Sequence, residues 1–284
     1  MSADRDFVED QEEDVSASLP LSGDAPDDTD GAGGPLKRDL VAGLEKGLSV
    51  IAAFDQERPR LTISEVAART GLTRAAARRY LLTLTHLGFV SQDRKMFSLT
   101  AKVLRLGQSY LHSARLPRIV EPELQKLAYT VKEVSVAGVL DGDDVICIAA
   151  TTAGRVVSTV PQPGMRVPAY CSAVGRVLMA AMPEDELDAF IARQELAPLT
   201  SHSITEPGRL RQEIARTRAQ GYACIDQELE VGLRVVAVPL KNYRGEVVSA
   251  INVSVHASRM SLDQMVEQCL PSLLHTQAHL RMLL

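Results

Sequence analysis

The amino-acid sequence predicts an α+β protein in which a winged helix-turn-helix precedes an antiparallel sheet with helices packed on it. Residues 61–97 read as two capped helices and a hairpin, and residues 133–255 as strands around a block of helices. The 45% hydrophobic content suits globular domains, and no apolar run approaches a membrane span. The expected parts are an acidic tail over 1–36, the winged motif over 37–100, a linker helix over 101–117 and a second domain over 118–284.

The first 36 residues differ in composition from the rest of the chain. They carry eleven acidic side chains against one basic side chain and are rich in Asp, Ser, Gly and Pro. Such a segment has too little apolar surface to form a core, so we expect it to be disordered. A solubilising tail is the favoured interpretation, and restraint of non-specific DNA binding by its charge is the alternative.

Two short helices are predicted by the residues at their ends. Thr62 and Glu65 have the spacing of a capping box at the start of the first helix, and Gly71 suits the left-handed residue that ends it. Thr73 is a good N-cap for the second helix. The apolar positions expected to pack together are Ala77, Tyr80, Leu81 and Leu84 of the second helix, with Leu44, Leu48, Ile51 and Phe54 of a preceding helix.

Basic side chains lie off this apolar stripe. Residues 37–105 hold thirteen Lys and Arg against six Asp and Glu, although the whole chain has a net charge of −5. In a winged helix-turn-helix, side chains near the start of the second helix read bases and the wing contacts phosphates. A merely solvated basic face is the alternative, but the caps, turn and wing together favour DNA. The expected DNA contacts are Ser64, Thr73, Arg74, Arg78, Arg79, Arg94 and Lys95.

The segment after the wing is predicted to be a linking helix over 101–116, ended by Pro117. It is more apolar than packing on a small wing requires, so Leu104, Leu106 and Leu111 are expected to help form a dimer contact. A second helix is expected over 121–130. The strands expected beyond it are 133–140, 145–151, 156–160, 222–226, 234–241 and 247–255, and the helices 171–182, 183–194, 207–220 and one from 261 onward.

Polar residues inside this second domain suggest a ligand pocket. The loop over 163–173 runs into a helix start, where free backbone N–H groups attract anions such as carboxylates. Arg166 or Arg234 could add a charge-assisted bond, or could simply pair with Glu228 or Glu230. Ordinary caps and ion pairs are therefore the alternative. The residues expected around a small carboxylate are Met165, Arg166, Tyr170, Cys171, Ser172, Ala173, Asp226, Arg234, Val235, Asn252 and Ser254.

Several functional classes are disfavoured by the composition. The four cysteines and six histidines show no metal-ligand spacing, so neither a metal nor another cofactor is expected. The thiols fit a reduced, cytoplasmic protein. The chain lacks tryptophan and only 4% of it is aromatic, which disfavours stacking platforms for single-stranded nucleic acid. An enzyme with Cys171 as nucleophile is the rival class, but the pocket motifs contain no histidine to activate the thiol.

The sequence resembles the IclR family of bacterial transcription regulators from about Leu40 to its C-terminal end. The motifs that carry this resemblance are TISEVAARTGLTRAAARRYLLTLTHLGFV, PGMRVPAYCSAVGRVLMAAMP, GYACIDQELEVGLRVVAVPL and AINVSVHASRMS. Within the family, RAAARRYLLTL and PAYCSAVGRVL resemble the β-ketoadipate-pathway subgroup, the PcaR, PcaU and PobR type.

This resemblance implies a winged helix-turn-helix joined to a GAF-like effector-binding domain. It further implies dimers, often tetramers, that bind palindromic promoter sites and respond to protocatechuate, 4-hydroxybenzoate or β-ketoadipate. Many relatives have Ser-Thr-Val after the turn where this chain has Ala75-Ala76-Ala77, which shifts the expected DNA contact onto the neighbouring arginines. A regulator of another carboxylic-acid pathway and a ligand-free adaptor remain alternatives.

Overall fold

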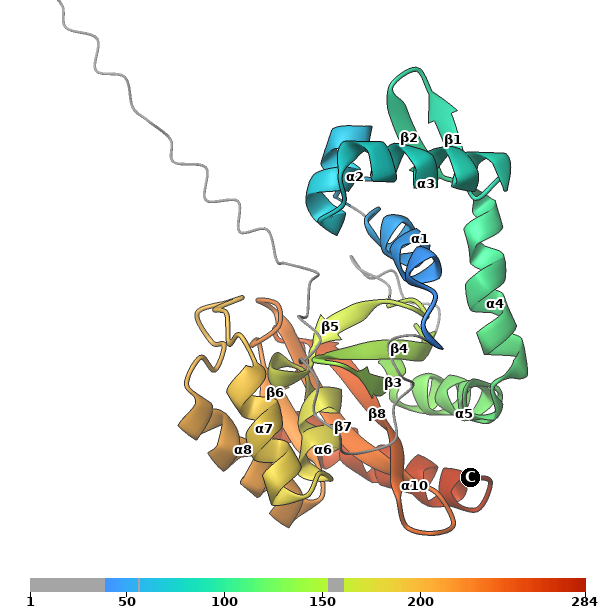
Figure 1. Cartoon of the computed structure of the whole chain (residues 1–284). Coiled ribbons are helices and arrows are strands. Elements are labelled where there is room, and N and C mark those ends of the chain that lie inside the picture. Colours follow the sequence, from blue (N-terminus) through green and yellow to red (C-terminus); the bar gives the residue numbers. More distant parts are fainter. Residues whose placement is uncertain (1–38, 56, 153–160) are drawn as a thin grey trace, which may run out of the picture. The chain divides into compact units, whose positions relative to one another are not determined.

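The computed structural model describes residues 39–55, 57–152 and 161–284, and it divides into two compact units between Leu106 and Gly107 (Figure 1). The acidic tail and the strand expected over 156–160 lie outside the described residues. Each unit is described by itself below. Within the described residues, no helix is long and apolar enough to cross a membrane.

The first unit is the predicted winged helix-turn-helix. Thr62 and Glu65 form both bonds of the capping box, Gly71 ends the same helix at φ 65°, and the side chain of Thr73 accepts from the amide of Ala76. The two strands of the wing pair antiparallel. The elements are α1 (Ala42–Ala52), α2 (Ile63–Thr70), α3 (Arg74–His86), β1 (Val90–Asp93) and β2 (Met96–Leu99).

The core of this unit differs from the expected one at α1. Leu44 and Leu48 are 63% and 52% exposed, so their predicted burial is wrong. Only the C-terminal end of α1 reaches the core, and the apolar stripe of the sequence extends beyond the surface that α2 and α3 cover. The buried residues are Val50, Ala53, Phe54, Leu61, Val66, Ala67, Ala77, Leu81, Leu84, Val90 and Phe97.

The segment after the wing contains two helices instead of one helix ended by Pro117. A short 3-10 turn, Ala101–Val103, leads into α4 (Leu104–Ser113), and the chain leaves helical geometry at Ala114, with ψ 127°. Helix α5 (Arg115–Val131) begins before Pro117, which is therefore in its first turn. Proline is tolerated there because the amide it lacks would have no partner within the helix. The expected boundary at Pro117 is wrong for this reason.

The second unit contains one six-stranded antiparallel sheet in the order β5-β4-β3-β8-β7-β6. Its short edge strand β5 lies where the sequence suggested only a loop. The strands are β3 (Val134–Asp141), β4 (Asp144–Thr151), β5 (Arg166–Pro168), β6 (Ala223–Asp226), β7 (Leu233–Lys241) and β8 (Val247–His256). The helices that follow α5 are α6 (Ala173–Ala180), α7 (Glu184–Arg193), α8 (Pro207–Gln220), α9 (Leu262–Gln268) and α10 (Leu270–Arg281).

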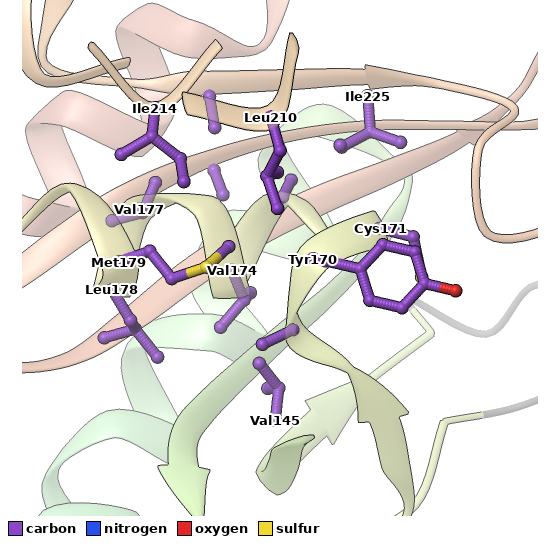
Figure 2. Packing of buried hydrophobic residues seen from close by; sticks show 14 of the residues in the cluster. Val145, Tyr170, Cys171, Val174, Val177, Leu178, Met179, Leu210, Ile214 and Ile225 are labelled. Carbon is purple, nitrogen blue, oxygen red and sulfur yellow. The ribbon is translucent and has the colours of Figure 1, made fainter. Parts of the chain in front are cut away.

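Helices cover both faces of this sheet. Successive side chains of a strand point to opposite faces, so Val235 and Ala237 of β7 join a core with α6, α7 and α8. Val236 and Val238 join a second core with α5, α9 and α10. Figure 2 shows side chains of α6 packed against Leu210 and Ile214 of α8 in the first of these cores. The α+β class expected from the sequence is confirmed.

Helix α6 approaches its neighbours closely at two glycines. A Cβ at Gly138 of β3 would lie 2.6 Å from Val145 Cγ1 and 3.2 Å from Val174 Cγ1 of α6. A Cβ at Gly175 would overlap the carbonyl oxygen of Ala169. The start of α6 is therefore held against the turn that precedes it, which matters because this end of α6 faces a cavity.

We expect Gly175→Ala to destabilise the second unit by about 1–3 kcal/mol, because the added methyl group meets backbone atoms that cannot rotate away. Thermal unfolding followed by circular dichroism should show the lower midpoint. Gly208→Ala is the matched control, since Gly208 is also in a helix but has nothing within 4 Å of the added carbon. Equal midpoints for both variants would contradict the close packing.

Candidate functional sites

The basic side chains of α3 are on its exposed face. Arg74, Arg78 and Arg79 are exposed, whereas Ala77 and Leu81 are buried on the other side of the helix. Among the described residues, none of the three arginines forms an ion pair. The helix thus presents three guanidinium groups whose donors are available to an external anion.

The wing adds two more cations to this unit. Arg94 takes the left-handed conformation at φ 55° in the turn between β1 and β2, and both it and Lys95 are exposed. The turn is braced by the ion pair of Arg60 with Asp93 at 2.6 Å and by a bond from Gln92 Nε2 to the carbonyl of Arg94 at 2.9 Å. The seven residues predicted to contact DNA all lie on the surface of this one unit.

The second unit contains a cavity of about 450 Å³ between the start of α6 and one face of the sheet. The floor of the cavity is formed by β3, β8 and β7, with β8 in the middle because it pairs with both of the others. Asn252 and Ser254 alternate along β8 and face the cavity with His256. Ser254 is flanked across the sheet by Val134 and Val235. A row of polar side chains therefore crosses an otherwise apolar floor.

The N-terminus of α6 forms another wall of this cavity. Ser172 caps the helix, and its Oγ accepts from the amide of Gly175 at 3.0 Å. The amides of Ala173 and Val174 also belong to the first turn, where a helix supplies no acceptor of its own. Ser172, Ala173 and Val174 all line the cavity. This wall combines amide donors with the positive end of the helix dipole.

The structure brings seven of the eleven residues predicted around a carboxylate to this cavity. They come from the loop before α6, from its first turn, and from β7 and β8. They are Met165, Cys171, Ser172, Ala173, Val235, Asn252 and Ser254. Arg166, Tyr170, Asp226 and Arg234 do not line it.

The two arginines among these four have acidic partners elsewhere. Arg166 pairs with Asp141 at 2.5 Å and with Asp144 at 3.0 Å, across the β3–β4 turn. Arg234 pairs with Asp226 at 2.7 Å, and this guanidinium lowers the pKa of the Asp226 carboxyl. Both side chains therefore brace the sheet. The partners of Arg234 are not the Glu228 or Glu230 that the sequence suggested.

The remaining member of the four, Tyr170, also serves the scaffold. It is buried, and its hydroxyl donates to the carbonyl of Ala197 at 2.7 Å. Figure 2 shows it beside Cys171, at the turn that leads into α6. Its bond ties that turn to the segment after α7.

A buried ion pair holds the opposite wall of the cavity. Arg176 of α6 is 2% exposed and binds Glu228 through both carboxylate oxygens, at 2.9 and 2.5 Å. Burial raises the pKa of the Glu228 carboxyl, and the charge of Arg176 opposes that rise. The hydroxyls of Thr200 and Ser203 donate to the carbonyls of Gln227 and Glu228, each at 2.7 Å. The loop that continues along the cavity through residues 229–232 is thereby anchored to α6.

Sequence reasoning missed a charged pair at the cavity. Arg259, in the turn after β8, pairs with Glu133: its Nη1 donates to Oε2 at 3.0 Å and its Nη2 lies 2.8 Å from Oε1, and both residues line the cavity. The Glu133 side chain is only 4% exposed. A charged residue just before an apolar strand, and an arginine just after the polar row of β8, were signals that could have drawn attention to the pair.

The cysteines at the cavity are neutral thiols. Burial raises the pKa of Cys171 to about 12 and that of Cys147 to about 11. A nucleophilic cysteine needs thiolate character at working pH, so these two serve as apolar wall. The ring of His256, which also lines the cavity, bonds Ser258 Oγ at 2.8 Å. Among the described residues, no three metal-binding side chains come together.

Two family models together match most of the chain. The IclR helix-turn-helix domain matches residues 43–94, and the model described as bacterial transcriptional regulator IclR C-terminal matches residues 108–280. The chain is 40% identical to the Pca regulon regulatory protein of Pseudomonas putida over 83% of its own length and 81% of that protein. It is 34% identical to the p-hydroxybenzoate hydroxylase transcriptional activator of Acinetobacter baylyi, over 86% and 92% of the two chains.

Solved structures give the same result. A proposed transcriptional regulator from Rhodococcus sp. RHA1 aligns with a TM-score of 0.74 and 42% identity, covering 86% of this chain and 98% of that one. The inducer-binding domain of PobR from Acinetobacter, a double mutant in complex with 3-hydroxybenzoic acid, aligns with a TM-score of 0.57 and 26% identity. That alignment covers 60% of this chain and all of that domain.

Proposed function

The chain belongs to the IclR family of bacterial transcription regulators, and we propose that it regulates genes of aromatic catabolism in response to a small acid. The proposed effector is an aromatic acid or a ring-cleavage product of the β-ketoadipate pathway. The observation that carries this proposal is the cavity bounded by the start of α6 and the polar row of β8, in the same chain as a basic winged helix-turn-helix. The names of the relatives in Pseudomonas and Acinetobacter support it.

In this proposal the carboxylate of the effector accepts bonds from the amides of Ala173 and Val174, helped by the dipole of α6. Its apolar part packs on Met165 and Val235. The polar far end meets Asn252 and Ser254. Among the described residues, the buried Oδ1 of Asn252 has no hydrogen-bond partner, and a hydroxyl group of a ligand would supply the missing donor.

DNA is the second proposed partner. Helix α3 would enter the major groove with Arg74, Arg78 and Arg79, while Arg94 and Lys95 of the wing contact phosphates or the minor groove. Ser64 and Thr73, at the starts of α2 and α3, would add contacts to the same duplex. Binding to chromosomal DNA would take place in the cytoplasm.

The protein would act as a dimer, possibly assembled further into a tetramer, on a palindromic promoter site. Leu104 and Leu106 of α4 are 65% and 50% exposed, which leaves apolar surface for a second copy. The side chain of Leu111, the third residue of the expected contact, is outside the described residues. One reading head contacts only a half-site, so two heads match an inverted repeat.

Two other functions compete with this proposal. Regulation of a different carboxylic-acid pathway would use the same cavity with another ligand. An enzyme with Cys171 as nucleophile is disfavoured by its pKa of about 12, because the thiol is protonated at neutral pH. Turnover of an aromatic acid would favour the enzyme, and salt-sensitive binding to a defined promoter favours the regulator.

We expect Arg78→Ala or Arg79→Ala to leave the fold intact and weaken DNA binding. A base-reading arginine should contribute roughly 1–3 kcal/mol and specificity, whereas a phosphate contact should lower affinity evenly and flatten the salt dependence. Fluorescence anisotropy with a duplex selected from a randomised pool measures both. Arg209→Ala, an exposed arginine on α8, is the control. Unchanged affinity in both α3 variants would reject the placement.

Sedimentation at micromolar concentration should show a dimer for the wild type. Replacing Leu104 and Leu106 together by Ser should shift the population toward monomer and weaken binding to the inverted repeat. Leu199→Ser, which replaces an exposed leucine of the second unit, should leave the assembly unchanged. A wild-type monomer that binds DNA as a monomer is the result that contradicts this prediction.

Calorimetry against protocatechuate, 4-hydroxybenzoate and β-ketoadipate tests the effector. At least one of them should bind, and Ser172→Trp should abolish binding because the indole fills the cavity beside the start of α6. Ser201→Trp, at an exposed turn away from the cavity lining, should bind as the wild type does. Equal binding to the Ser172 variant would place the ligand elsewhere.

A further inference from the structure

The ion pair of Arg259 with Glu133 connects the cavity to the end of α5. Arg259 Nη1 donates to Oε2 of Glu133 at 3.0 Å, its Nη2 lies 2.8 Å from Oε1, and both residues line the cavity. Glu133 comes two residues after Val131, the last residue of α5. A ligand group that contacts the Arg259 guanidinium therefore contacts the ion-pair partner of Glu133, a residue that lies just after α5.

The residue between α5 and Glu133 has an unusual backbone conformation. Lys132 ends the helix at φ 56° and ψ 35°, the left-handed region that side chains other than those of Gly, Asn and Asp rarely occupy. A residue held in such a conformation depends on its surroundings to keep it there. The pair at Glu133 is one contact that supports this conformation, because it fixes the chain directly after the turn.

The turn that carries Arg259 is held by several contacts. The amide of Ala257 donates to the carbonyl of Gly232 at 2.7 Å, and the amide of Arg259 donates to the carbonyl of His256 at 2.9 Å. Arg234 Nη1 donates to the carbonyls of both Ala257 and Met260, at 2.9 and 2.7 Å. We therefore expect a change in the ion pair to alter the end of α5 more than it alters this braced turn.

We propose that the Arg259–Glu133 pair is the contact through which an acid bound in the cavity acts on α5, the helix that continues the chain from α4. This rests on the proposed function, in which the cavity holds a small acid. Acceptor groups of the ligand share the donors of the Arg259 guanidinium and weaken its hold on Glu133. Because the Glu133 carboxylate is buried, weakening this ion pair is costly, so the ligand favours a different arrangement of the end of α5.

Among the described residues, the other charged or titratable side chains that line the cavity are Glu230, His256 and the thiols of Cys147 and Cys171. Glu230 is in the loop anchored by Arg176, and the ring of His256 bonds Ser258, in the turn that carries Arg259. Neither residue follows α5 in the chain. The direct covalent path from the cavity floor to α5 therefore passes through Glu133 and Lys132.

The experiment compares the wild type with Glu133→Gln and with the control Glu123→Gln. The control removes a carboxylate that lies within α5, pairs with Lys126 at 2.7 Å and does not line the cavity. Anisotropy gives the affinity for the selected duplex with and without saturating 4-hydroxybenzoate or protocatechuate, and calorimetry verifies that the acid is bound. We expect the acid to change the affinity of the wild type and of Glu123→Gln by about 10-fold, within the usual range of coupling between sites. In Glu133→Gln the acid should still bind, but it should change the DNA affinity by less than about 2-fold, which is below the usual range of coupling between sites.

A measurement without ligand tests independently whether the ion pair holds the end of α5. Amide hydrogen exchange over residues 128–134 should be several-fold faster in Glu133→Gln than in the wild type, and unchanged in Glu123→Gln. A Glu133→Gln protein that binds the acid and keeps the wild-type change in DNA affinity would overturn the proposal, as would unchanged exchange. If no acid binds the wild type, the proposed effector class fails, and the exchange result still tests the hold of the pair on α5.

Discussion

The buried ion pair of Arg176 with Glu228 is the contact on which the shape of the cavity depends. Arg176 is among the largest fully buried side chains of the chain, and it points from α6 to the loop after β6. Such a pair adds little net stability over apolar residues of similar size, but removing one partner costs about 3–5 kcal/mol. Its value here is geometric, since it fixes the distance between the first turn of α6 and the loop that forms the facing wall.

The sheet determines which chemistry lies between those two walls. Because side chains alternate along β8, Asn252 and Ser254 face the cavity while Ile251 and Val253 face the core with α5 and α10. The strand order then places this polar row in the middle of the sheet, away from either edge. A polar group in such a position needs a partner, and a ligand provides one where the chain does not.

The features that sequence reasoning predicted correctly are those decided by nearby residues. The capping box at Thr62, the left-handed Gly71 and the cap at Thr73 each depend on residues within three positions. The boundary at Pro117 was predicted wrongly because a proline stops one helix and starts another with equal ease. The burial of Leu44 was predicted wrongly because the periodicity of a helix does not say how far its neighbours extend.

The cavity itself shows where local reasoning ends. Seven expected residues meet there because they share a strand face or a helix start, which are properties of short segments. Ion-pair partners cannot be found in this way. Arg259 and Glu133 are 126 residues apart, and Arg176 and Glu228 are 52 apart, so only the fold identifies them as pairs. For the same reason Arg234 was expected at a ligand, although an acid eight residues before it is its partner.

The arrangement of charge also distinguishes the two units. In the second unit the arginines that carry the scaffold have acidic partners, as in the pairs of Arg166 with Asp141 and Arg218 with Glu184. In the described part of the first unit, the arginines of α3 and the wing residues Arg94 and Lys95 form no ion pair. A guanidinium with a partner serves the fold, whereas one exposed without a partner keeps its donors for another molecule. The cations of α3 and the wing are therefore surface charge available to a polyanion, even though the whole chain is acidic.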